Sequence, residues 1–504
     1  MASYQEMCAK LLSQGRAKVG TLSEILDRMQ STWSYGVRTK ETEVLTALIR
    51  TAMKSDPGGM AAPLTSLGYL MASIIPQEGN VKTIGVFSDL GVLAAVILGL
   101  RQQESDVKVT FFGHTDEQVA FARGLGVKAI CVLKGDLDDF FKREGDFFKR
   151  EGDMKFDVVI GNPPYQKGVQ AEYSEYNNAS SAAPIYQKFH DKAEKDFGAT
   201  VIIMVVPAKC LVGGAHLDEF LRDVLKSGRI RKITRRPANP GWFPGVGSFD
   251  GNIVYLWDRK YQGEIAFSAE TGPETNPKTD TVTVDPTKYD ILLMEADALT
   301  MPLLDKVLEK ANRDFTKPLG MTPYGLPTDH FTNSKYHSQV PLDPNSTVMC
   351  AYVGLKKRGK PQFQPTSRDQ IKKNRNSIDM WKVSTAHAGR TGGINDGRFM
   401  SDVFILEPGQ ICTHSYLVLG TFATQAEALN MRSVVDNPLY QWLAHLRIAR
   451  KISPDVFKWM PKLDWTRSWT AKEIYARFDL TDQEIAYVEN YMKTVTTKRS
   501  VYAR

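Results

Sequence analysis

Four residues that follow a predicted apolar strand, of the types Asn, Pro, Pro and Tyr, could carry out chemistry on an amine. The stretch 156–160 is apolar except for Asp157 and leads through a glycine into Asn162, Pro163, Pro164 and Tyr165. The exocyclic amine of a nucleobase is a poor nucleophile because its lone pair is delocalised into the ring. The Asn162 side-chain oxygen and the Pro163 carbonyl could accept its hydrogens and favour a pyramidal nitrogen. Attack on a donor methyl group then needs mainly positioning.

The two prolines and the tyrosine fit this role. Proline fixes φ near −65° and donates no hydrogen bond, so the loop is stiff and the direction of its carbonyl is set. Tyr165 offers a flat face for stacking, and an enzyme that acts on a base in a duplex must first take that base out of the stack. A simple proline-stiffened turn is the alternative. The asparagine before the prolines, the tyrosine after them and the strand ahead favour a catalytic loop.

Strands and helices are expected to alternate from residue 80 onward, because short apolar runs alternate with helically periodic segments. This pattern is typical of a mostly parallel sheet with helices on both faces, a doubly wound α/β fold. Ligands in such sheets bind beyond the carboxyl ends of the strands, where Asn162 would lie. The predicted strands are 83–87, 107–112, 129–133, 156–160, 200–206 and 253–257, and the predicted helices are 91–100, 117–125, 184–195 and 216–226.

The chain divides into three predicted parts. Residues 1–80 are predicted to be mainly helical and to pack on the catalytic domain, which spans 81–262. Residues 263–504 form a mixed α/β part with helical stretches at 435–450 and 470–493, and residues 268–290 are predicted to be a linker or surface excursion. Asp139–Gly145 is repeated without change as Asp146–Gly152, so the Phe140-Phe141 pair is either a lid over the site or, as is commoner, a core contact.

The composition argues against a membrane, secreted or metal-binding protein. The 504 residues include no run of about 18 apolar residues, so we expect no membrane span and no secretion signal. The histidines show no metal-ligand spacing, which predicts that no metal is bound. Widely spaced cysteines without a CxxC pair indicate a reducing cytoplasm: Cys8, Cys131, Cys210, Cys350 and Cys412.

Basic residues are concentrated in two places. Lys356–Arg398 contains eleven Lys or Arg against three Asp, a local excess larger than the net charge of +7 of the whole chain. A second cluster comprises Arg229, Arg231, Lys232, Arg235 and Arg236. Concentrated positive charge indicates a polyanionic partner, although a solvated face is the simpler interpretation for either cluster alone.

The sequence resembles the N6-adenine DNA methyltransferases that use S-adenosylmethionine. Its motif order is similar to the gamma class and to the methylase part of type II restriction–modification enzymes. The resemblance implies a class I S-adenosylmethionine-dependent methyltransferase fold, catalysis by residues 162–165 on an adenine flipped out of double-stranded DNA, and a target-recognition domain at 263–504. Later segments also look like family motifs: 184–189, 201–207, 242–258 and, more loosely, 381–383, 411–416 and 480–485.

The cofactor half departs from the family pattern. The family has an acidic residue and a Gly-x-Gly turn after the first strand, whereas residues 86–93 contain one glycine. By resemblance, Asp116 would hold the ribose hydroxyls and Asp136 would lie near the adenine ring of the cofactor. The full set that the resemblance assigns to the cofactor is Thr39, Phe87, Ser88, Asp89, Gly91, Asp116 and Asp136.

Two other functions stay open. A methyltransferase-like DNA-binding protein with weak or no turnover is favoured by the altered glycine turn and opposed by the intact Asn162–Tyr165 run. A methyltransferase that acts on RNA or protein could use the same run, but the long basic extension fits duplex DNA better. The target sequence, the biological role and the oligomeric state cannot be predicted from the sequence.

Overall fold

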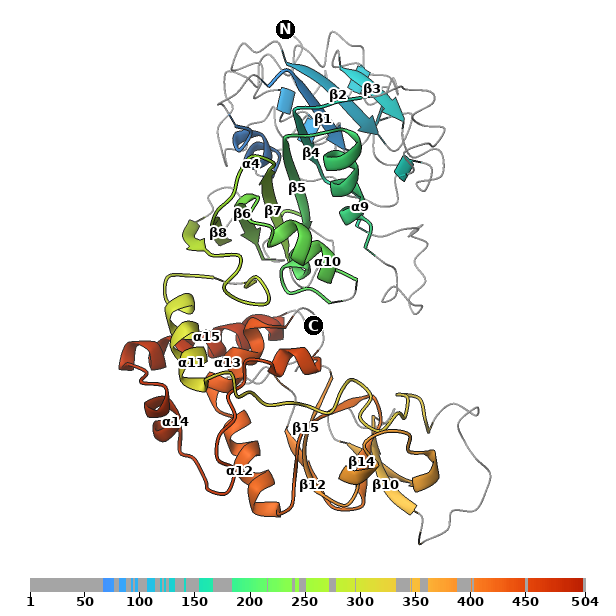
Figure 1. Ribbon diagram of the computed structural model, residues 1–504, viewed down its shortest axis with the longest axis vertical. Coiled ribbons are helices and arrows are strands. Elements are labelled where there is room, and N and C mark those ends of the chain that lie inside the picture. Colours follow the sequence, from blue (N-terminus) through green and yellow to red (C-terminus); the bar gives the residue numbers. More distant parts are fainter. Residues whose placement is uncertain are drawn as a thin grey trace. The chain divides into compact units, whose positions relative to one another are not determined.

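The protein consists of two compact units, Met1–Met294 and Glu295–Arg504, each considered by itself. The structure is a computed structural model (Figure 1). It describes residues 67–76, 81–87, 107–113, 127–131, 154–165, 184–214, 216–237, 241–243, 251–271, 278–294, 296–331, 347–353, 361–387, 403–448 and 452–501, with a few isolated positions between these ranges. The predicted N-terminal helices lie outside them.

A nine-stranded sheet forms the first unit, in the order β3-β2-β1-β4-β5-β7-β6-β8-β9. All pairs from β3 to β5 are parallel, whereas β7 runs antiparallel to both β5 and β6. This is the class I methyltransferase arrangement, so the predicted fold class is confirmed. The strands are β1 (Thr83–Phe87), β2 (Lys108–Gly113), β3 (Lys128–Cys131), β4 (Val158–Gly161), β5 (Val201–Pro207), β6 (Ile230–Arg236), β7 (Asn252–Asp258), β8 (Ile265–Thr271) and β9 (Lys278–Val284).

The two faces of the sheet bury different kinds of side chain. One face is mostly aliphatic: β1, β4 and β5 place Val86, Ile160 and Ile203 in a cluster with Leu67 and Met71 of α4 (Leu67–Ser73). The other face is aromatic and is covered by α9 (Tyr186–Asp191), η1 (Lys192–Asp196), α10 (Asp218–Phe220) and η3 (Leu221–Leu225) (Figure 1). Alternation of side chains along each strand produces this division.

Asp157 fixes the start of β4 against the start of β1. Its carboxylate Oδ2 accepts hydrogen bonds from the backbone N–H groups of Lys82 and Thr83 at 2.8 and 2.9 Å and from the Thr83 hydroxyl at 3.0 Å. Burial acts to raise the pKa of Asp157, but these hydrogen bonds outweigh it and the pKa is lowered. The carboxylate therefore stays ionised and sets the register in which Phe87 lies opposite Gly161.

Three strands of the first unit were absent from the sequence prediction: β6, β8 and β9. Residues 268–290, expected to be a linker, supply most of β8 and all of β9, which extend the sheet beyond residue 262. The boundary between the two compact units lies at 294/295 in the sequence, after both of these strands. β6 was missed because its sequence, Ile230–Arg236, is rich in Arg and Lys and lacks a continuous apolar run. The helices expected at 184–195 and 216–226 form, but each ends in a π-helical turn, η1 and η3.

The second unit contains two small sheets, β11-β10-β14 and β13-β12-β15, and a group of helices. Both predicted helical stretches are confirmed. Reciprocal Thr/Glu capping boxes begin α12 and α14. The elements are α11 (Thr300–Ala311), β10 (Thr347–Tyr352), β11 (Gln362–Ser367), β12 (Trp381–Ala386), β13 (Phe404–Leu406), β14 (Gln410–Cys412), β15 (Tyr416–Phe422), α12 (Gln425–Val435), α13 (Pro438–Leu446), α14 (Ala471–Arg477) and α15 (Asp482–Val501).

Two kinds of feature are absent from the part of the chain that the structure describes. No helix there is both long and apolar enough to cross a bilayer. Among the same residues, no group of three or more His, Cys, Asp or Glu side chains is arranged to hold a metal ion.

We predict that Gly161→Ala damages both stability and the catalytic loop. A Cβ atom at Gly161 would lie 2.7 Å from Phe87 Cβ, so β1 and β4 would have to separate where the loop begins. Such overpacking costs about 1–3 kcal/mol of unfolding free energy, measurable by urea titration. Gly85→Ala is the matched control: its Cβ would lie 3.2 Å from the Phe156 ring, which can shift. An equal loss in both variants would contradict the special role of Gly161.

Candidate active site

The Asn162–Tyr165 loop leaves the sheet at the carboxyl end of β4. β4 lies between β1 and β5, both parallel to it, so the loop begins near the middle of the sheet edge. Asn162 is 1% exposed and Pro163 is buried, whereas Pro164 and Tyr165 are partly exposed. The rigid, buried part of the loop thus comes first and the aromatic ring that could meet a base comes last.

Tyr165 is held at both its backbone and its ring. Its carbonyl accepts a hydrogen bond from the backbone N–H of Ile185 at 3.2 Å, which ties the loop to the start of α9. Its ring meets the Tyr186 ring edge-to-face, with centroids 6.2 Å apart. Its hydroxyl accepts a hydrogen bond from Asn252 Nδ2 at 3.1 Å. Residue 252 lies in the family-like segment 242–258, but its place in the sequence does not predict a contact with the loop.

Of the predicted cofactor residues, only Phe87 lies among the described residues. Its side chain is buried in an aromatic cluster, with ring centroids 5.0 Å from Phe112 and 5.5 Å from Phe189. β1 ends at Phe87, which lies opposite Gly161, so the carboxyl end of β1 lies beside the start of the Asn162–Tyr165 loop. The cofactor-site assignment stays a prediction, and its other members lie outside the described residues: Thr39, Ser88, Asp89, Gly91, Asp116 and Asp136.

Phe140 belongs to the same aromatic cluster. It is 1% exposed, and its ring lies 5.9 Å from Phe189 and 6.1 Å from Phe87. Lys192 Nζ lies 5.1 Å from the centroid of the Phe140 ring, within the range of a cation–π contact. The first copy of the repeat therefore provides a core contact and not a lid. The second copy lies outside the described residues.

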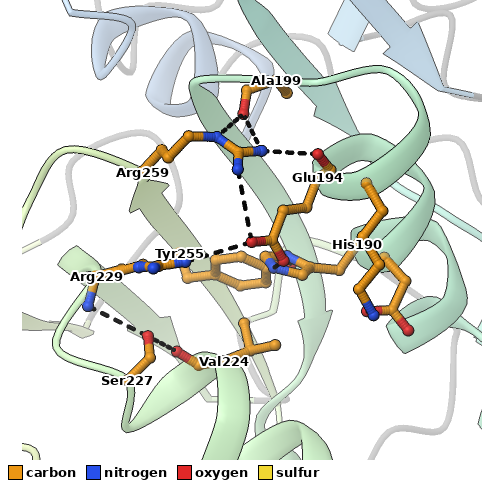
Figure 2. Close-up of polar contacts among 10 residues, drawn as sticks. His190, Glu194, Ala199, Val224, Ser227, Arg229, Tyr255 and Arg259 are labelled. Atoms are coloured by element: carbon orange, nitrogen blue, oxygen red, sulfur yellow. Dashed lines mark hydrogen bonds and ion pairs between the residues drawn. The ribbon is translucent and has the colours of Figure 1, made fainter.

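A polar network fixes the far end of the helix that follows the catalytic loop (Figure 2). Arg259 donates to the carbonyl oxygens of Ala199 and Glu194, with its Nη2 2.7 Å from the Glu194 oxygen. The Glu194 carboxylate lies 3.4 Å from Arg229 Nη1. These contacts fasten η1 to the segments at the start of β6 and the end of β7. Because η1 continues α9 directly, they also limit movement of Tyr186 at the other end.

His190 lies inside this region without a charge. It is fully buried, and its Nδ1 lies 3.0 Å from the Tyr255 hydroxyl (Figure 2). Burial, reinforced by the nearby cations Lys195 and Arg259, lowers the pKa of His190 to about 3. The imidazole is neutral at physiological pH, so the 3.9 Å approach of Glu194 to Nε2 is not an ion pair. His190 is a packing and hydrogen-bonding residue of the aromatic face.

The described part of the basic segment Lys356–Arg398 divides into internal and external cations. Lys382 is 0% exposed and donates to the Ile378 and Met380 carbonyls at 2.7 and 2.6 Å; burial lowers its pKa to about 8. Arg368 pairs with Asp379 at 2.5 Å. Three exposed cations follow one another in the β11–β12 connection: Lys372, Lys373 and Arg375.

The second basic cluster is part of the sheet. Arg235 and Arg236 lie in β6 and are 8% and 1% exposed. Arg236 forms a buried ion pair with Glu270 of β8, with Nη1 and Oε2 3.1 Å apart. Arg229 and Arg231 pair with Glu194 and Asp258 at 3.4 and 3.5 Å. The expected footprint of a polyanion at this cluster is therefore corrected, because most of its charge is used within the first unit.

Comparison with known proteins agrees with the catalytic motif. Residues 35–240 match the Eco57I restriction-modification methylase family. This match contains the catalytic loop, and it confirms the resemblance that the loop predicted. The matching region includes all of the predicted cofactor residues as well.

Individual relatives cover less of the chain. An uncharacterized adenine-specific methylase of Mycoplasma pneumoniae is 31% identical over 118 residues, which are 23% of this chain and 27% of the relative. The chain thus spans about a quarter of that relative. The type I restriction-modification system methyltransferase subunit from Streptococcus thermophilus is 15% identical, with a TM-score of 0.34 over 47% of this chain and 54% of that one. A putative class I S-adenosylmethionine-dependent methyltransferase from Listeria monocytogenes is 13% identical, with a TM-score of 0.34 over 54% and 92%.

We predict that His190 contributes a specific acid sensitivity to the methylase unit. Its folded pKa of about 3 lies below the value of about 6.5 for an unfolded histidine. Between these values the unfolded chain binds one more proton, so the free energy of unfolding falls as the pH falls, by at most about 1.4 kcal/mol per pH unit. Urea titrations from pH 7 to pH 4 should show a shallower pH dependence for His190→Gln than for the wild type. Equal slopes would contradict the neutral, buried assignment.

Proposed function

We propose that this protein is an S-adenosylmethionine-dependent DNA methyltransferase that modifies the N6 amino group of adenine. The observation that carries the proposal is the buried Asn162 at the carboxyl end of a central parallel strand, followed by Pro163-Pro164-Tyr165, within a region that matches restriction-modification methylases. The adenine-specific methylase of Mycoplasma pneumoniae that resembles part of the chain supports adenine as the target.

The loop residues have distinct roles in this proposal. The Asn162 amide oxygen and the Pro163 carbonyl accept the two hydrogens of the adenine amine. Because Asn162 is enclosed, its interaction with the amine is little weakened by solvent. The partly exposed Tyr165 ring stacks on the flipped base and offsets part of the cost of unstacking. These groups act mainly by orientation, and no charged side chain is required to remove a proton before methyl transfer.

The position of the donor site fits the same edge of the sheet. When bound, S-adenosylmethionine supplies an activated methyl group. β1 ends opposite Gly161, one residue before Asn162, so a group bound at the carboxyl end of β1 would lie close to the amine. β2 and β3 are parallel to β1, so their carboxyl ends lie at this same edge, and the predicted Asp116 and Asp136 follow these strands in the sequence. The proposed cofactor residues are those predicted from the sequence.

The second unit is proposed to recognise double-stranded DNA. Of the described cations in the basic segment, Lys372, Lys373 and Arg375 are exposed, and we assign them to phosphate contacts. Lys382 and Arg368 are not assigned to DNA, because the former is buried against backbone carbonyls and the latter is paired with Asp379.

We predict that Asn162→Ala lowers methyl transfer by about 100-fold or more, the scale expected for loss of a group that stabilises developing charge, while DNA affinity is unchanged. The assay incubates purified protein with duplex DNA of mixed sequence and labelled S-adenosylmethionine, then identifies N6-methyladenine by nucleoside analysis. Asn430→Ala, a matched substitution in α12, should retain activity. Parallel loss of DNA binding in the Asn162 variant would contradict the assigned role.

The same assay separates the alternatives for the wild-type protein. Cofactor binding by calorimetry without methyl transfer to DNA would redirect the proposal to RNA or protein substrates. Absence of both cofactor binding and transfer would favour a DNA-binding protein without turnover.

We predict that replacing Lys372, Lys373 and Arg375 together by Ala weakens DNA binding uniformly across sequences. The slope of log affinity against log salt should fall in magnitude by about 0.9 for each phosphate contact that is lost. Fluorescence anisotropy over a range of salt concentrations measures this slope. A triple variant of the exposed Lys458, Lys462 and Lys472 removes the same charge elsewhere in the unit. Equal slopes for the two triple variants would exclude a specific role of the β11–β12 connection.

A further inference from the structure

Asn252 connects the start of β7 to the aromatic residue of the catalytic loop. The two residues are far apart in sequence, yet Asn252 Nδ2 lies 3.1 Å from the Tyr165 hydroxyl and donates to it. Asn252 is 5% exposed, so water competes little for its amide group. The contact therefore links the stacking ring to a strand that takes no other assigned part in the chemistry.

The sheet holds Asn252 in one position. In the β-ladders it lies opposite Pro207 of β5 on one side and Arg236 of β6 on the other. The preceding residue, Gly251, has φ of +73°, and a Cβ there would lie 2.2 Å from the Arg236 carbonyl oxygen. Only glycine fits this turn. The Gly251 carbonyl in turn accepts a hydrogen bond from Ala208 N at 3.0 Å, which joins the turn to β5.

A buried ion pair supports the strand against which this turn packs. Arg236 and Glu270 are 1% and 2% exposed, and their Nη1 and Oε2 atoms are 3.1 Å apart. The end of β6 is thereby fixed to β8. The support of Asn252 thus runs from Glu270 through Arg236 to the tight contact at Gly251.

The hydrogen bond holds the end of the Tyr165 side chain that lies farthest from the backbone. The Ile185 N–H holds the Tyr165 backbone, and Tyr186 packs edge-to-face on the ring. Because the hydroxyl lies on the axis of the ring, a donor there restricts the swing of the whole ring about the bond from Cα to Cβ. It therefore reduces the ordering that base stacking would otherwise require.

We propose that Asn252 is a positioning residue for Tyr165, which orients the ring before the flipped adenine arrives. This inference rests on the proposed methyltransferase function. Asn252 does not contact the base in this proposal; it acts through the Tyr165 hydroxyl.

A double-mutant cycle tests the proposal. Tyr165→Phe keeps the stacking ring and removes the hydroxyl, whereas Asn252→Ala removes the donor. Each single variant should reduce methyl transfer and the 2-aminopurine fluorescence that reports flipping at the target base by about two- to tenfold, the effect of one hydrogen bond. The double variant should be no worse than the worse single variant. If Asn252→Ala causes the same further loss in the Tyr165→Phe background, its role is structural and the proposal is overturned.

Two further variants separate positioning from folding. Asn252→Asp should recover most of the loss seen in Asn252→Ala, because the Tyr165 hydroxyl can donate to the new carboxylate. Tyr255→Phe is the matched control: it removes a buried hydrogen bond of the same strand, the one to His190, without touching Tyr165. Its effect should be independent of Tyr165→Phe. Coupling of Tyr255→Phe to Tyr165→Phe as strong as that of Asn252→Ala would overturn the specific link.

A readout without DNA distinguishes failure of this proposal from failure of the proposed function. In protein labelled with ¹³Cζ-tyrosine, the Tyr165 resonance is assigned by its disappearance in Tyr165→Phe. Asn252→Ala should shift this resonance because the phenol oxygen loses its donor. An unchanged resonance overturns the positioning role even if the enzyme methylates DNA. A shifted resonance in a protein that methylates no DNA would retain the contact and reject the methyltransferase function.

Discussion

The catalytic edge of the sheet depends on how closely β4 approaches β1. Where β1 and β4 begin, the Asp157 carboxylate accepts hydrogen bonds from the N–H groups of Lys82 and Thr83 and fixes the register of the two strands. At the other end, Gly161 lies so near Phe87 that no side chain fits between them. Asn162 is the next residue after this contact. The position of the proposed amine acceptor is therefore set by backbone packing before any loop contact is made.

Contacts from α9 and β7 complete the site around Tyr165. Tyr165 receives contacts from α9 and from β7, and α9 is fastened at its far end by the Glu194 and Arg259 network. The aromatic face of the sheet lies beneath this helix and buries Phe87 and Phe189. Packing below the loop, together with the contacts of Tyr165 to α9 and β7, gives a ring that is supported and still partly exposed.

Most of the fold and the central motif could be predicted from the sequence, for a physical reason. Strands that are buried on both faces have uninterrupted apolar sequences, as in Val201–Val206. The proline-rich loop has few alternative conformations. β6 was missed because Arg235 and Arg236 are buried in ion-paired or otherwise bonded form, which a count of charges cannot distinguish from exposure. Lys382 was likewise counted in the basic segment, although it is buried and donates to a backbone carbonyl.

The contacts of the site were harder to predict than its residues. The sequence around Asn252 does not predict its contact with Tyr165, because that contact depends on a strand pairing and on the positive φ of the glycine before it. The neutral state of His190 depends on burial that its sequence neighbours do not reveal. Local chemistry can be predicted from residue types, whereas partnerships across the sheet require the three-dimensional register.

The Arg236–Glu270 pair has a consequence for how the chain can be divided. A fragment that stopped at residue 262 would retain the catalytic loop, β7 and Asn252, but it would lack Glu270 and the two strands beyond β6. Its guanidinium group would then sit at a newly exposed sheet edge without this carboxylate, beside the turn that carries Gly251. A fragment of the first unit that keeps this ion pair therefore has to include β8, and β9, which pairs with β8, ends at residue 284.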